Sequence, residues 1–133
     1  MSILVVDAAF LVHAVMTRDG AIAQWTLRLL SQAGLLLAPH LVHVELTSAL
    51  RKMVQKKLIS RAEMRAGLQN ALDLDLQLEP FEPHAERVLE LVDNVTPYDA
   101  WYVAIAEAWD APLATGDNRL HEAAGPRCKI LVP

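Results

Sequence analysis

Short apolar runs alternate with longer amphipathic segments along the chain, and this alternation predicts strands that are each followed by a helix. Five runs are typical of strands, the third weakened by Pro80: residues 2–6, 35–38, 77–81, 112–115 and 129–132. The segments between them predict helices: residues 8–16, 21–33, a long helix opened by Pro39, 61–73, 84–92, 97–109 and 118–124. Such alternation indicates a parallel sheet covered on both faces. We therefore predict an α/β fold, a three-layer α/β/α sandwich with a central, mostly parallel sheet, in one domain over residues 1–133.

Two of the predicted helices carry recognisable start signals. Ser60 and Glu63 have the spacing of a capping box, in which each side chain satisfies a backbone N–H of the other residue. Thr96 is a good N-cap residue, and Pro97 suits the first helical position that follows it. The helix after Pro97 carries few charges, so we expect it to be buried on most sides.

Composition fits a packed intracellular domain. The 133 residues are 53% hydrophobic and 21% charged, and the one cysteine, Cys128, excludes an internal disulfide and favours a reducing compartment. The apolar N-terminal segment lacks a basic leader and contains Asp7 and His13, which argues against a signal peptide or a membrane span. We expect a cytoplasmic protein without membrane association.

The net charge of −4 is unusual for a protein that would bind nucleic acid by itself, because such binding depends on neutralising phosphates. An activity on nucleic acid would therefore require another source of positive charge. The six basic residues of the segment 51–65 could guide RNA, although a solvated face explains most of them better: Arg51, Lys52, Lys56, Lys57, Arg61 and Arg65.

Four acids are predicted to meet at one edge of the sheet. Asp7 ends the first strand, Asp117 follows the fourth, and Asp99 begins the helix that leads into the fourth strand. Glu45 lies about two turns into the helix after the second strand, just outside its apolar stripe. Functional groups of open parallel sheets gather where strands end at their carboxyl side. The acids therefore come from distant segments but point to a common site.

Each acid also has a simple structural explanation. Asp7 and Asp117 suit helix caps or turns, Asp99 suits the first turn of a helix, and Glu45 suits a solvated helix face. Taken together, however, four carboxylates at one edge repel one another unless cations join them. Hard divalent ions such as Mg²⁺ and Mn²⁺ prefer oxygen ligands, and a bound ion would both attract phosphate and activate water.

These residues carry a family resemblance. Asp7 after an aliphatic strand, "LVHVELTSALRK" around Glu45, "NVTPYDAWYVAIAEAWDAPLATGDNRL" around Asp99 and Asp117, and a closing "KILV" together resemble the PIN domain, most of all VapC-type toxins of toxin–antitoxin pairs. The resemblance covers essentially the whole chain. It implies a metal-dependent endoribonuclease that binds Mg²⁺, or Mn²⁺, at its acid cluster, with Thr115 in "TGD" helping to order the site.

The resemblance also implies roles and partners. Asp7, Asp99 and Asp117 would hold metal directly or through water, and Glu45 would complete the shell or orient the water that attacks an RNA phosphodiester. The expected partners are an RNA substrate, a VapB-like antitoxin and a second copy of the chain in a homodimer. Two positions depart from the family pattern, since Ala8 replaces a common Ser or Thr and Val92 replaces a common arginine.

Two alternatives remain open at this point. A non-catalytic PIN-like module that binds RNA or protein gains some support from Ala8, while the complete set of four acids argues against it. His40 and His43 have a spacing that can bind Zn²⁺, but no third ligand stands at a matching distance, so surface histidines are the better interpretation. The tryptophans Trp25, Trp101 and Trp109 are expected in the core or at subunit contacts.

Overall fold

The computed structural model describes residues 2–133 and contains a five-stranded sheet in the order β3-β2-β1-β4-β5. Every pair of neighbouring strands is parallel. The strands are β1 (Ile3–Val6), β2 (Leu35–Pro39), β3 (Leu76–Glu79), β4 (Leu113–Ala114) and β5 (Ile130–Leu131). The predicted α/β sandwich with a parallel sheet is confirmed.

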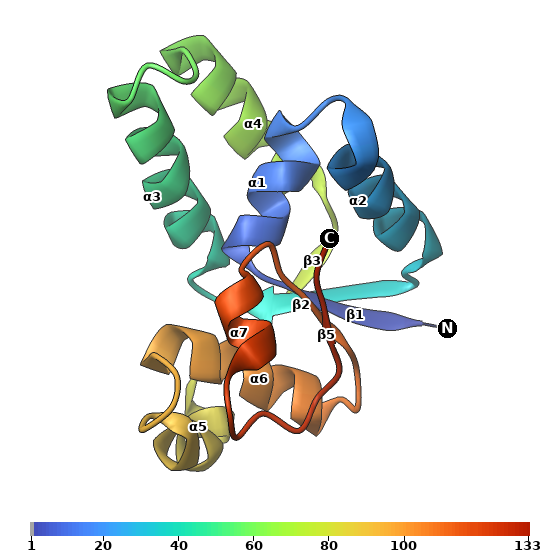
Figure 1. The fold of residues 1–133 in the computed structure, drawn as a ribbon, viewed down its shortest axis with the longest axis vertical. Coiled ribbons are helices and arrows are strands. Elements are labelled where there is room, and N and C mark those ends of the chain that lie inside the picture. Colours follow the sequence, from blue (N-terminus) through green and yellow to red (C-terminus); the bar gives the residue numbers. More distant parts are fainter. Residues whose placement is uncertain (1) are drawn as a thin grey trace.

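Helices cover both faces of this sheet. Those that follow β1 and β2 gather on one side in Figure 1: α1 (Ala8–Met16), α2 (Gly20–Gln32), α3 (Val42–Gln55) and α4 (Arg61–Asp73). The helices after β3 lie on the opposite side, with a single 3₁₀ turn, η1 (Glu82–His84), before them: α5 (Ala85–Leu91) and α6 (Pro97–Ala108). The short α7 (Asn118–Glu122) contacts β5. No helix in the described part of the chain is long and apolar enough to span a bilayer.

The strand order creates a switch point at β1. The chain runs outward from β1 through β2 to β3, then returns across the sheet to β4 on the other side of β1. The connection after β1 and the connection after β4 therefore leave the sheet toward opposite faces. Their divergence opens a crevice at the carboxyl ends of these two strands, of the kind that α/β proteins use for binding. Asp7 directly follows β1, and Thr115 directly follows β4.

The core lies on both faces of the sheet, between the sheet and α6 on one side and between the sheet and α1 and α3 on the other. Val5 and Val6 of β1 pair with Leu113 and Ala114 of β4, and all four side chains are fully buried. Every residue from Ala100 to Ala106 on α6 is also buried, as the sequence predicted. A helix so completely enclosed cannot shift without disturbing the sheet, so its first turn is a rigid platform for Asp99.

The structure corrects several predicted boundaries. Pro39 does not open a helix: it is the last residue of β2 and pairs with Glu79 at the end of β3. A proline is tolerated at this strand end, since the following His40 supplies the N–H to the Glu79 carbonyl. The helix α3 therefore begins only at Val42, which places Glu45 in its first turn and not two turns in.

Other elements are shorter than predicted. Pairing in β4 and β5 is limited to two residues each, and β3 ends before Pro80, whose missing N–H cannot continue the ladder. The helix predicted at 84–92 starts as the 3₁₀ turn η1, and the one predicted at 118–124 ends at Glu122.

Replacement of Ser60 by Ala should destabilise the protein by about 1 kcal/mol, because the capping box is present in full. The Ser60 hydroxyl accepts the Glu63 N–H at 3.0 Å, and the Glu63 carboxylate accepts the Ser60 N–H at 2.9 Å. Urea unfolding measures the loss. Ser31→Ala is the matched control, since that exposed hydroxyl only donates to the Arg28 carbonyl within α2; equal losses in both variants would contradict the role assigned to the cap.

Candidate functional site

Asp7 is a buried carboxylate held by two donors. One oxygen, Oδ1, accepts the Phe10 N–H at 2.7 Å, which makes Asp7 the N-cap of α1. The other, Oδ2, accepts the hydroxyl proton of Thr115. Only 6% of Asp7 is exposed. The simple interpretation of Asp7 as a helix cap is therefore correct, and the cap also fixes the direction of the carboxylate.

Thr115 connects Asp7 to the loop that carries Asp117. Its hydroxyl donates to Asp7 and accepts the Asp117 N–H at 2.9 Å. The side chain is fully buried, so no water competes for these bonds. Asp117 in turn caps α7 by accepting the Arg119 N–H at 2.9 Å. The Thr115 hydroxyl thus helps to hold the segment after β4 against the end of β1, beside the backbone bond from the Asp7 N–H to the Ala114 carbonyl.

Glu45 is oriented by Tyr102, a residue that the sequence analysis did not single out. The Tyr102 hydroxyl donates to Glu45 Oε1 at 2.8 Å. Burial and the neighbouring Glu45 raise the pKa of Tyr102, so the phenol stays protonated and remains a donor. The available signal was the spacing of three between Asp99 and Tyr102, which places both on one face of α6.

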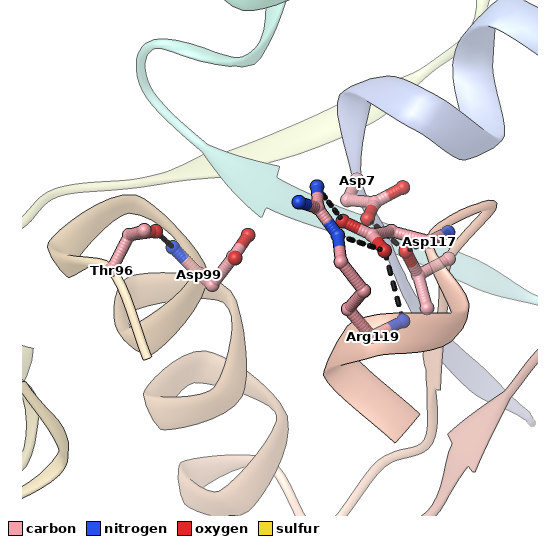
Figure 2. A network of polar contacts seen from close by, with 6 residues as sticks. Asp7, Thr96, Asp99, Asp117 and Arg119 are labelled. Atoms are coloured by element: carbon pink, nitrogen blue, oxygen red, sulfur yellow. Dashed lines mark hydrogen bonds and ion pairs between the residues drawn. The ribbon is translucent and has the colours of Figure 1, made fainter. Parts of the chain in front are cut away.

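Asp99 lies in the first turn of α6. Its backbone N–H donates to the Thr96 hydroxyl at 3.2 Å, as expected for the predicted N-cap. Figure 2 shows the Asp99 carboxylate directed from α6 toward the guanidinium of Arg119, which is paired with Asp117. The Asp99 carboxylate thus faces the segment after β4, as the sequence predicted.

The pKa shifts indicate that the four acids interact with one another electrostatically. Burial is the main reason that the pKa of Asp7 rises to about 6, and repulsion from Asp99 and Glu45 adds to it. Burial also raises the pKa of Glu45 and of Asp99. Asp99 is further repelled by Asp117, whose own pKa is lowered chiefly by its hydrogen bonds with Arg119. Each carboxylate is therefore electrostatically coupled to at least one other.

The carboxylates face one another without converging on a single point. Within residues 2–133, no three Asp, Glu, His or Cys side chains are close enough to ligate one ion together. Magnesium keeps several of its waters and needs only one or two direct carboxylates, so acids spaced around an ion through water suit it. These mutually repelling carboxylates, of which Asp7 is buried and the others are partly exposed, offer the oxygen ligands that a divalent cation prefers.

A surface cavity borders the site at Glu45. It has a volume of about 450 Å³, and its wall includes Leu41, Val44, Lys52 and Tyr98. Lys52, one member of the predicted basic cluster, therefore lines the same cavity as Glu45. All six members are exposed, and the other five do not line this cavity.

The remaining residues that the sequence singled out have structural places. His40 precedes α3 and is exposed, and His43 lies in its first turn, so the two do not share a helix. Trp25 packs edge-on against Phe10 and Trp101 against Phe81, whereas Trp109 lies at the surface and donates to Glu79. Ala8 begins α1 beside Asp7 without a polar side chain, and Val92 is exposed at the end of α5.

Comparison with known proteins gives matches along the whole chain. The family model described as the PIN domain matches residues 4–126. Ribonuclease VapC1 of Mycobacterium tuberculosis is 43% identical over 130 residues, which cover 95% of this chain and 94% of the relative.

Solved structures share the fold. The PAE2754 protein of Pyrobaculum aerophilum superposes with a TM-score of 0.72 at 24% identity, covering 97% of this chain and 83% of that one. VapBC2 of Rickettsia felis, solved bound to a DNA fragment from its promoter, gives a TM-score of 0.68 at 16% identity and covers 98% of both chains.

Replacement of Asp7 by Asn should stabilise the protein at pH 8 in the presence of EDTA. The folded pKa of about 6 exceeds the ordinary value of 3.8, so above pH 6 the folded state alone bears the cost of a buried charge. That cost is at most about 3 kcal/mol for a shift of this size. Asn remains a good N-cap, so the helix start is preserved.

Thermal unfolding between pH 4 and pH 8 measures the effect. The gain should be largest above pH 6 and should shrink toward pH 4, where Asp7 is protonated in the folded state. Asp75→Asn is the control, because Asp75 is exposed and precedes β3 at the opposite edge of the sheet. An Asp7→Asn protein that melts lower than the parent at pH 8 would contradict the assigned cost.

Proposed function

The chain belongs to the PIN-domain family, among the VapC ribonucleases, and from this premise we propose that it is a metal-dependent endoribonuclease toxin of a toxin–antitoxin pair. The observation that supports the proposal is the placement of Asp7, Glu45, Asp99 and Asp117 at helix N-termini along the carboxyl edge of the sheet, where repulsion couples each carboxylate to at least one other. An acidic protein needs another source of positive charge to act on RNA, and a cation bound among these mutually repelling carboxylates would supply it.

Each side chain has a distinct role in this proposal. Asp7, fixed by Phe10 and Thr115, presents a carboxylate of constant direction to the cation. Asp99 and Asp117 approach from α6 and from the segment after β4. Glu45, held by the Tyr102 hydroxyl, is placed to orient the water that attacks the phosphodiester. A bound Mg²⁺ or Mn²⁺ would supply the positive charge that attracts the phosphate and would lower the pKa of that water.

The cavity beside Glu45 offers RNA a place to approach the acids. Tyr98 provides an exposed aromatic face on which a base can stack, and Lys52 provides a charge for a neighbouring phosphate. Both groups lie within the wall of the same cavity as Glu45, so a nucleotide bound there would place its backbone near the carboxylates.

The partners follow from the same proposal. Relatives of the VapBC type are toxin–antitoxin proteins, which supports a VapB-like antitoxin as the inhibitor of this chain. Exposed apolar residues near the site, among them Leu41, Phe81 and Tyr98, line a further cavity of about 350 Å³ with Trp101. Such a surface suits a homodimer contact or the antitoxin, since aromatic residues are enriched in interfaces.

A binding module that has lost catalysis is the second candidate. Ala8 favours it, because the residue beside Asp7 lacks a hydroxyl that could contact a cation or a water. The free-energy cost of burying the Asp7 charge favours catalysis, because a protein that only binds could replace this acid and gain stability.

The proposal predicts that Asp99→Asn abolishes metal-dependent cutting of RNA. The carboxylate is half-buried and faces the site, so its loss should lower the cleavage rate by about 100-fold or more. Cleavage of a mixed RNA pool with Mg²⁺ or Mn²⁺, repeated with EDTA, measures the rate, and sequencing of the ends identifies the substrate. Asp75→Asn should cut at the parental rate.

Cutting that persists in EDTA would remove the cation from the proposal. Absence of cutting by the parent protein, with Asp99→Asn as toxic in cells as the parent, would support the binding module instead.

Tyr102→Phe should lower the cleavage rate by about 10-fold while leaving the fold intact, because it removes only the hydrogen bond that orients Glu45. That bond lowers the pKa of Glu45, which burial raises. Its loss should therefore move the acidic limb of the rate profile to higher pH. A profile that keeps its position, with an unchanged rate, would show that Glu45 does not depend on Tyr102.

A further inference from the structure

Arg119 occupies both oxygens of a carboxylate in the acid cluster. Its Nε donates to Asp117 Oδ1 at 3.1 Å, and its Nη2 donates to Oδ2 at 2.9 Å. The backbone N–H of Arg119 donates to the same Oδ1 at 2.9 Å. A carboxylate accepts only about four hydrogen bonds in total. With three of these acceptor sites occupied, Asp117 retains little capacity for a metal ion.

The guanidinium also acts on Asp99. Its positive charge attracts the Asp99 carboxylate, whereas the charge of Asp117 repels it. Figure 2 shows the guanidinium on the side of Asp117 that faces Asp99. The Arg119 guanidinium thus lies between the two acids, and its positive charge offsets their negative charges.

The ion pair between Arg119 and Asp117 can break at low cost. The Arg119 side chain is 91% exposed, whereas that of Asp117 is 30% exposed. Ion pairs this exposed contribute little to stability, because water solvates the separated charges almost as well. The two residues are also only two positions apart, so the pair forms without constraining distant segments. Arg119 can therefore leave Asp117 at low cost and without disturbing the fold.

We propose that Arg119 is a tethered counter-ion of the acid cluster, which holds Asp117 when no divalent cation is bound and releases it when the ion enters. The inference rests on the proposed function, since it assumes that Asp117 takes part in binding the cation. Arg119 is a positioning residue in this account: it sets which way Asp117 points and how tightly the ion binds.

The decisive measurement is the affinity for Mn²⁺, followed by titration of the full-length protein with detection of free Mn²⁺ by electron paramagnetic resonance. Arg119→Gln removes the charge and the fork, and we expect it to bind Mn²⁺ roughly 3- to 10-fold more tightly than the parent. Arg119→Lys keeps the charge but cannot bridge both oxygens, so its affinity should lie between the two. Arg61→Gln, a substitution of an exposed arginine in the first turn of α4, should leave the affinity unchanged.

A second readout follows the guanidinium itself. In the nuclear magnetic resonance spectrum of the ¹⁵N-labelled parent protein, the Arg119 Nε–H signal should shift and exchange faster with solvent when Mg²⁺ is added. The Nε–H signal of Arg87, which is bound to Glu107 at 2.7 Å on another part of the surface, should not change. This pair of signals separates release of Arg119 from a general effect of ions.

Several outcomes would overturn the inference. An Arg119→Gln protein that binds Mn²⁺ with parental or lower affinity would show that the arginine does not compete with the ion. An Arg119 Nε–H signal that stays unchanged at saturating Mg²⁺ would show that the pair persists in the loaded site. If Arg119→Gln instead weakens RNA binding while Mn²⁺ affinity is unchanged, Arg119 is a phosphate contact.

Failure of the proposed function looks different. In that case the parent protein and all the variants, including Asp99→Asn, would show no saturable Mn²⁺ binding. If the parent binds Mn²⁺, Asp99→Asn does not, and Arg119→Gln binds it with parental affinity, then only the counter-ion role of Arg119 is wrong.

Discussion

The free-energy cost of keeping like charges together at the end of β1 is the main constraint on the arrangement of the site. Asp7 is almost inaccessible to water, and its charge is offset locally by only two donors, the Phe10 N–H and the Thr115 hydroxyl. These bonds lower the pKa of Asp7, but burial outweighs them and the pKa remains near 6. At neutral pH the folded protein therefore bears the cost of a buried carboxylate charge at Asp7.

The helices reduce this cost by their placement. Asp7 and Asp117 are the N-caps of α1 and α7, and Glu45 and Asp99 lie in the first turns of α3 and α6. In a parallel α/β fold, strands end where helices begin, so acids at this edge necessarily meet helix N-termini, whose free N–H groups favour negative charge. The structural explanation of each acid is therefore compatible with the proposed function. A carboxylate that caps a helix or lies in its first turn can also face the candidate site.

This dual role explains what the sequence could predict. Asp7, Asp99 and Asp117 were predictable because the alternation of strands and helices fixes the edge at which they must lie. The prediction at Pro39 was wrong, because proline is tolerated at a strand end as well as at a helix start. The error displaced the predicted position of Glu45 within its helix by one turn. Tyr102 and Arg119 were missed for another reason. Their roles depend on which rotamer reaches a neighbouring carboxylate. The spacing of three places Tyr102 on the same face of α6 as Asp99, but it does not encode the reach of the Tyr102 hydroxyl to Glu45.

The two sides of the site differ in how they are held. Asp7 and Thr115 are 108 positions apart in the sequence, so their contact depends on the pairing of β1 with β4 in the core. The pair of Arg119 and Asp117 spans two residues at the surface and needs nothing beyond its own turn. Long-range contacts in a close-packed interior are rigid, whereas local contacts in water exchange readily. The Asp7 carboxylate is thus held by contacts in the core, whereas the pairing of Arg119 with Asp117 can rearrange at the surface without disturbing them.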